Sequence, residues 1–224
     1  MIYDQFASKL ARDYELFLFA ISGRYLSYVL PRADASPQMV AQFEQGAASL
    51  RETFLDSANR AIDEYARSQP SARLGELAFG FRSELTRITA DNVQVLSGRL
   101  RGTVFGESML MRGFAGPMGL LLQQKLSQPE FTVTTASGRT YQALPLVKSQ
   151  AREFAYRSWL SAELARIAPY TDLVSVTYPD PAHEGNGRVF SISGRTPGFP
   201  SFADIEESVF HYNATAGVTH HVSA

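Results

Sequence analysis

Three successive stretches within residues 1–97 carry apolar side chains at helical spacing, and this pattern constrains the fold more than any other feature. In the first stretch, over residues 2–30, steps of three and four connect Phe6, Leu10, Tyr14, Phe17, Ile21, Tyr25 and Tyr28. Such a period places side chains along one face of a helix. Ser36-Pro37 is a typical helix start for a second stretch, to about residue 69, and the period resumes after Pro70. The sequence therefore predicts a bundle of long helices.

The aromatic stripe on the first helix allows two interpretations. Stripes of this kind usually form the core between helices. So many large apolar side chains could also exceed what a small bundle buries, and exposed apolar surface marks partner sites. We therefore expect a helical docking region over residues 1–97, with these side chains as anchors: Phe6, Tyr14, Phe17, Ile21 and Tyr25.

Residues 98–129 are rich in glycine and include Arg99, Arg101 and Arg112. The glycine spacing matches neither a P-loop nor a dinucleotide-binding loop. The simplest interpretation is a linker with a short helix. The alternative is an arginine-lined loop that contacts DNA or an acidic partner through these three residues.

The periodicity changes after Pro129. Residues 131–135 and 140–144 alternate around Ser137-Gly138 and predict a hairpin, and a helix follows from Pro145 to about Ile167. Residues 172–178 and 188–193 predict an antiparallel pair, to which residues 217–222 add a further strand. The predicted fold class is α+β: long N-terminal helices, a linker over 98–129, and a small antiparallel β-containing unit over 130–224.

Composition narrows the class of protein. The chain of 224 residues has no cysteine, which excludes disulfides and thiolate chemistry. Its formal net charge is −1, unlike a strongly basic DNA-binding protein. The most apolar run, residues 16–30, is short for a bilayer and contains Arg24, so we expect a soluble, non-secreted protein without a membrane partner.

The C-terminal part carries a set of short motifs in a fixed order. They are S-G-R-T-Y in the hairpin, D-L-V-S-V from Asp172, G-R-V-F-S-I-S-G-R-T-P-G-F-P from Gly187, F-H-Y-N from Phe210, and a terminal H-H-V. In this order they resemble the C-terminal half of phage minor head proteins of the Mu F-like head morphogenesis family, over about residues 130–224. Family members carry a cysteine after the D-L-V strand and another in a terminal F-H-P-N-C-R-H pattern, and this chain has neither.

The resemblance implies a non-enzymatic structural protein of the virion. Such a protein sits with the portal inside the phage head, present in several copies, and assists head assembly or genome delivery. Its implied partners are the portal, the major coat protein and packaged DNA. Its implied location is the portal vertex of the head, and the host cytoplasm during assembly.

The alternative function is that of a metal-dependent hydrolase or nuclease. All four histidines lie in the last 42 residues, and His211, His220 and His221 with His183 or Asp180 would be the ligands. Adjacent His220 and His221 point to opposite faces of a strand, so only one can join a given site. The H-E-x-x-H pattern of metalloproteases does not occur. We therefore expect no catalytic residue, metal or cofactor.

Overall fold

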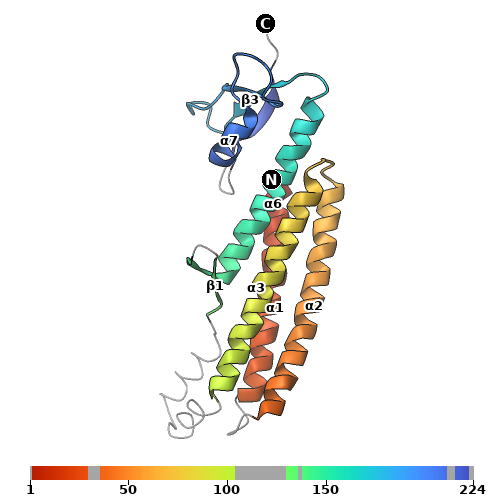
Figure 1. Cartoon of the computed structure of the whole chain (residues 1–224), viewed down its shortest axis with the longest axis vertical. Helices are drawn as coiled ribbons and strands as arrows, with labels where there is room; N and C mark the ends of the chain where they lie inside the picture. The colour runs from red at the N-terminus through yellow and green to blue at the C-terminus, as the bar shows by residue number, and fades with distance from the viewer. Residues whose placement is uncertain (1, 30–35, 104–129, 136–137, 211–214, 222–224) are drawn as a thin grey trace. The chain divides into compact units, whose positions relative to one another are not determined.

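A computed structural model describes residues 2–29, 36–103, 130–135, 138–210 and 215–221 (Figure 1). In chain order its elements are α1 (Ile2–Val29), α2 (Pro37–Arg67), α3 (Leu74–Thr103), β1 (Thr132–Thr134), β2 (Thr140–Gln142), α6 (Ala143–Ile167), β3 (Leu173–Thr177), β4 (Val189–Ser191), α7 (Phe202–Val209) and β5 (Gly217–His220). Long helices come first and small antiparallel sheets follow, which confirms the predicted α+β class. No helix of the described residues is long and apolar enough to cross a membrane.

The chain forms two compact units that draw on interleaved parts of the sequence. We call residues 8–61 and 82–148 the bundle unit, and residues 1–7, 62–81 and 149–224 the sheet unit. These units differ from the predicted consecutive ranges 1–97, 98–129 and 130–224, because helices of 25 to 31 residues contribute to both of them. Helix α3 also continues to Thr103, past the predicted start of the linker.

In the bundle unit, α1, α2 and α3 lie side by side (Figure 1). Tyr14 of α1 contacts Phe54 of α2, with ring centroids 5.6 Å apart, and Tyr25 further along α1 contacts Phe43 earlier in α2, at 6.3 Å. These two helices are therefore antiparallel. On α3, the buried Asn92 side chain donates a hydrogen bond to the Tyr14 hydroxyl. This hydrogen bond gives the buried Tyr14 hydroxyl and the Asn92 amide N–H a partner each.

A glycine in α2 makes room for a charged side chain of α1. A Cβ atom at Gly46 would lie 1.9 Å from the guanidinium carbon of Arg24. Arg24 lies over the ring of Tyr28 at 5.9 Å and donates to the Gln42 carbonyl at 3.4 Å. The absence of a side chain at Gly46 thus leaves the space that the Arg24 guanidinium occupies.

The predicted hairpin lies in the bundle unit, and the predicted helix after it begins there, with residues 149–167 belonging to the sheet unit. Strands β1 and β2 are antiparallel, with Val133 opposite Tyr141, and Gly138 takes the positive φ of 78° that the turn requires. Helix α6 begins at Ala143, before the predicted start at Pro145. Proline fits the first turn of a helix, where its missing N–H has no partner to lose.

The sheet unit contains a three-stranded antiparallel sheet in the order β4-β3-β5. Val174 of the central strand is opposite Phe190 of β4 and His220 of β5. The predicted antiparallel pairing of residues 172–178 with residues 188–193 is confirmed as β3 and β4, and β5 pairs with the other edge of β3. Helix α7 was not predicted, although Ser201 caps it by accepting from the Ala203 N–H, and Asp204 lies in its first turn.

Aromatic side chains make up much of the core of the sheet unit. Phe154 of α6 lies among Phe6, Tyr65 and Phe81, with ring centroids 5.1 to 6.1 Å away. The buried Tyr65 hydroxyl donates to the carbonyl of Ala155 at 2.9 Å. Burial also raises the pKa of this phenol. The hydrogen bond satisfies the polar tip of a side chain whose body is otherwise in apolar contact.

Candidate functional site

The five side chains expected to dock a partner are buried within the chain itself. They are Phe6, Tyr14, Phe17, Ile21 and Tyr25, and none is more than 9% exposed. Phe6 packs on Tyr65 in the sheet unit, at 4.8 Å between centroids, while Tyr14 and Phe17 pack on Phe54 in the bundle unit. The prediction that this stripe exceeds what the fold can bury is wrong, because other helices supply matching aromatic faces.

A different face of α1 is exposed instead. Leu16 is 60% and Phe19 78% exposed, and we call these two residues the Leu16–Phe19 patch. They lie three residues apart and so share one side of the helix. Sequence reasoning missed this patch, because a helix that is apolar on two sides does not reveal which side its neighbours cover.

The predicted arginine loop is only partly described. Arg99 and Arg101 lie in the last turns of α3, rather than in an irregular loop, and Arg112 lies outside the described residues. The Arg101 guanidinium is paired with Glu44 of α2, with Nη2 to Oε1 at 2.5 Å. Arg101 therefore forms an ion pair between α2 and α3 and does not lie in a loop of the kind predicted to contact DNA.

This ion pair stands at one end of an open groove between α2 and α3, with a volume of about 400 Å³. Ala48, Ala90, Val93 and Gly98 line the groove. On its rim, Arg51 donates to the hydroxyl of Thr89 at 3.0 Å and to the carbonyl of Thr86 at 2.9 Å. We call this feature the α2–α3 groove.

The histidines proposed as metal ligands make separate contacts. The imidazole of His183 stacks on Tyr178 at 3.6 Å, and its Nδ1 accepts from the Gly185 N–H at 3.0 Å. Nδ1 of His221 lies 3.2 Å from the Ser175 hydroxyl, and His220 is exposed at the end of β5. Among the described residues, no three His, Cys, Asp or Glu side chains form a metal-ligating group.

Asp180 and His211 complete the set of predicted metal ligands. The Asp180 carboxylate accepts from the Ala182 N–H at 2.9 Å and so shapes its own loop. His211 lies outside the described residues. The described residues thus contain no ligand cluster of the kind that the hydrolase interpretation requires.

A cluster of hydrogen bonds surrounds Asp172, just before β3. Its carboxylate accepts from the Ser191 hydroxyl at 2.5 Å, the Thr196 hydroxyl at 2.6 Å and the Ser193 N–H at 2.8 Å. Its carbonyl accepts from the Ile192 N–H at 2.8 Å. We call residues 192–200 the Asp172 loop, because this one residue holds the segment at several points.

These hydrogen bonds fix the charge of the carboxylate. Donors from Ser191, Thr196 and Ser193 lower the pKa of Asp172 from 3.8 to about 2, because they stabilise the ionised form. At neutral pH the group is therefore an anion whose oxygens already have donors. A carboxylate in this state is poorly suited to act as a general base.

The two ends of the loop meet at the edge of the sheet. The Ser191 N–H donates to the carbonyl of Pro200 at 2.9 Å, and Ser191 also forms a parallel bridge with Ser201. Within the loop, Gly194 and Gly198 have φ values of 69° and 84°. A Cβ at Gly194 would lie 3.0 Å from the Ser201 hydroxyl, so glycine is needed there for both conformation and space.

The loop displays two side chains of the kinds that dominate protein interfaces. Arg195 is exposed, and Phe199 is 37% exposed although it is aromatic. Aromatic residues and arginine are enriched among the anchors of interfaces. Sequence reasoning missed this arrangement. The signal that could have revealed it is Asp172, just before β3, together with the S-x-S-x-x-T pattern that begins at Ser191 in the antiparallel strand β4.

Residues 172–201 thus fold into one hydrogen-bonded substructure that leads into the capped helix α7. No protein-family model, curated protein or solved structure matches this chain.

Proposed function

We propose that this chain is a non-enzymatic structural protein of a tailed-phage virion, a minor head protein that associates with the portal and assists head assembly or genome delivery. The observation behind the proposal is that residues of the motifs that carry the resemblance form one hydrogen-bonded cluster. Asp172, Ser191, Ser193 and Thr196 all belong to the motifs that carry the resemblance, and they hydrogen-bond to one another. In this chain the motifs build a fixed loop.

The chemistry of the loop favours binding over catalysis. The Asp172 carboxylate is ionised and accepts from three donors, so it holds the backbone in place. A loop fixed in this way presents Arg195 and Phe199 with little loss of conformational entropy on binding. We therefore assign the portal contact to the Asp172 loop, in place of the buried stripe of α1.

The interaction with the portal is tested by co-expression. The full chain is produced with the portal protein encoded by the same genome, and the mixture is separated by size-exclusion chromatography. We expect a complex that the double substitution Arg195→Ala and Phe199→Ser weakens. The control is Phe79→Ser, which removes another exposed phenylalanine of the sheet unit and should leave the complex intact.

The same preparation tests the alternative function. The purified chain is incubated with duplex DNA and with Mg²⁺ or Zn²⁺. DNA cleavage that requires the metal and is lost in His183→Ala or His221→Ala, together with failure to bind the portal, would replace the structural proposal with the hydrolase one.

A further inference from the structure

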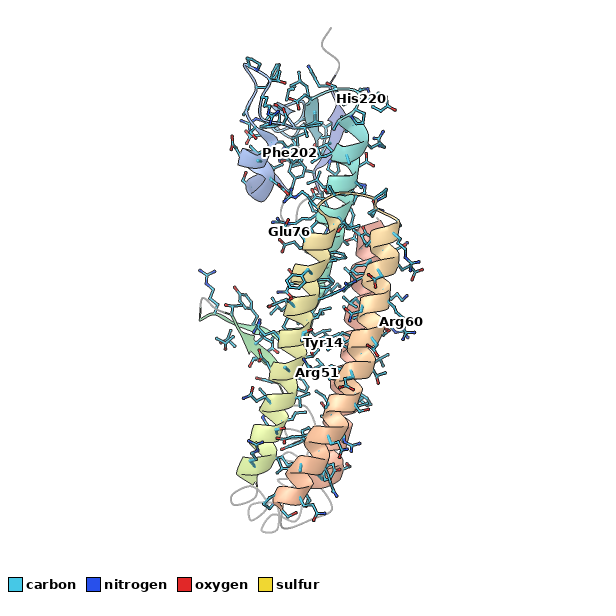
Figure 2. The ribbon with its side chains drawn as sticks, turned by 45° about the vertical axis from the view of Figure 1, so that its right-hand side comes forward. Tyr14, Arg51, Arg60, Glu76, Phe202 and His220 are labelled. Carbon is cyan, nitrogen blue, oxygen red and sulfur yellow. The ribbon has the colours of Figure 1, made fainter. Side chains whose placement is uncertain are left out.

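We propose that Asn186-Gly187 is a latent site of spontaneous deamidation, which the folded chain keeps closed. The site lies in residues 178–187, which we call the β3–β4 loop. This loop joins two strands of the three-stranded sheet, whose remaining strand β5 ends at His220 (Figure 2). It shares no residue with the Asp172 loop, so the inference goes beyond the portal contact and does not depend on it.

Asn186 has the sequence context in which this reaction is easiest. The chain has four asparagines, and only Asn186 is followed by glycine. The backbone nitrogen of a glycine reaches the preceding side chain readily, because no Cβ stands in the way. The fold requires this glycine, since Gly187 has a φ of 75°, which other residues rarely adopt. The turn before β4 thus imposes a chemically labile sequence.

The reaction has two steps. The backbone nitrogen of Gly187 loses its proton to the solvent and forms a bond to Cγ of Asn186, while the bond from Cγ to Nδ2 breaks and ammonia leaves. Water then opens the cyclic imide at either of its carbonyls, which leaves aspartate or isoaspartate at position 186. Water is the only co-reactant, so the reaction needs neither an enzyme nor a cofactor.

In the folded loop, hydrogen bonds hold both reacting groups. The Gly187 N–H donates to the carbonyl of Val176 at 2.9 Å. Oδ1 of Asn186 accepts from the Tyr178 N–H at 2.6 Å, and Nδ2 donates to the carbonyl of Asp180 at 2.7 Å. Attack removes the Gly187 proton and moves Cγ onto the nitrogen, which breaks these bonds. The loop must therefore open locally before the reaction can occur.

The ring of Tyr178 supports the closed loop. It stacks on the imidazole of His183 at 3.6 Å, and Nδ1 of His183 accepts from the Gly185 N–H at 3.0 Å. A Cβ at Gly185 would lie 2.6 Å from the Tyr178 ring, so the ring is close against the backbone just before Asn186. Removing this ring should loosen the loop without changing either reacting group.

Deamidation prevents the loop from closing again. In aspartate an oxygen replaces Nδ2, so two acceptors face each other where Asn186 now donates to the Asp180 carbonyl. The new charge also joins those of Asp180 and Glu184 in the same loop. Isoaspartate adds one carbon atom to the main chain and so displaces the Gly187 N–H from Val176. A single opening that ends in reaction therefore leaves the loop permanently open.

Peptide mass spectrometry on the full chain tests the site, in mildly alkaline buffer that favours loss of the glycine proton. In guanidinium chloride, Asn186 should react fastest of the four asparagines. In the folded chain it should react roughly tenfold or more slowly, because three hydrogen bonds must open first. Equal rates in the folded and unfolded chain, or a faster reaction at another asparagine of the unfolded chain, would overturn the proposal.

A pair of tyrosine variants tests whether the β3–β4 loop itself closes the site. Tyr178→Ala removes the stacked ring and should speed deamidation of the folded chain roughly threefold or more. The control is Tyr170→Ala, which removes an exposed tyrosine of the sheet unit and should leave the rate unchanged. Thermal unfolding checks that both variants are folded. Equal deamidation rates in the two folded variants would contradict the role of the loop.

Hydrogen exchange tests whether the modified loop stays open. Asn186→Asp reproduces one product of the reaction, and amide exchange over residues 176–188 should be faster in this variant than in the unmodified chain. The control is Asn59→Asp on α2, which should leave exchange in this segment unchanged. Slow exchange in Asn186→Asp, equal to that of the unmodified chain, would refute the claim that deamidation opens the loop.

Discussion

Replacing Asp172 by asparagine tests whether this residue holds the Asp172 loop. The substitution keeps the shape of the side chain but removes its charge and one acceptor oxygen. The carboxylate accepts from two hydroxyls and one N–H at 2.5 to 2.8 Å, and the Ser191 hydroxyl is fully buried. A hydrogen bond to a charged group contributes about 1.5–3 kcal/mol, and a buried donor without an acceptor is costly. Asp172 is partly exposed, so solvent screens part of the contribution of these hydrogen bonds. We therefore expect Asp172→Asn to lower the free energy of unfolding by roughly 1–3 kcal/mol.

The effect should depend on pH in one direction. The folded state lowers the pKa of Asp172 to about 2 from the unfolded value of 3.8. A lowered carboxylate pKa stabilises the fold above the unfolded value, and this contribution is lost as the pH falls through the folded value. The difference between the unmodified chain and Asp172→Asn should therefore be largest at neutral pH and shrink below about pH 3.8.

Urea unfolding followed by tryptophan fluorescence provides the assay. Trp159 is the only tryptophan and stacks on Tyr156 in the sheet unit, so its emission reports on the unit that contains Asp172. The control is Asp56→Asn, an exposed carboxylate on α2. If Asp172→Asn unfolds at the same urea concentration as the unmodified chain at pH 7, the loop is not held by this residue.

Three further predictions concern the core, the loop and metal binding. Phe17→Ala should lower the free energy of unfolding, measured in urea, by about 3–5 kcal/mol, because this side chain is buried. Phe19→Ser should leave the free energy of unfolding of the monomer nearly unchanged, because this side chain is exposed. Equal losses in the two variants would contradict the assignment of core and surface on α1. Gly194→Ala and Gly187→Ala both place a Cβ at positive φ, but only the Cβ at position 194 also meets Ser201, the capping serine of α7. Gly194→Ala should therefore have the lower melting temperature of the two variants. A lower melting temperature for Gly187→Ala would refute the turn geometry. Elemental analysis of the purified chain should find no stoichiometric metal, and one ion per chain that disappears in His211→Ala would revive the hydrolase interpretation.

The helices and strands followed from the sequence because their signals are local. Steps of three and four between apolar residues predicted α1, α2 and α3, and alternation around Ser137-Gly138 predicted the β1–β2 hairpin. Helix α7 escaped prediction because it is short and follows a proline- and glycine-rich loop, so its capping serine was the main signal.

The surfaces did not follow from the sequence, because burial depends on which helix covers which face. α1 is apolar on two sides, and only the three-dimensional arrangement shows that Tyr14 and Phe17 are in the core while Leu16 and Phe19 are exposed. The role of Asp172 depends likewise on the register that brings Ser191 beside it, which composition and spacing do not reveal.

Quantitative mass spectrometry of phage particles tests the proposed function most directly. Particles produced from the genome that encodes this chain are purified, and peptides of the chain, the portal and the coat protein are counted against labelled standards. A minor head protein should be present in the particle at an abundance comparable to that of the portal and far below that of the coat protein. Absence of the chain from particles that contain a full complement of portal would contradict the proposal.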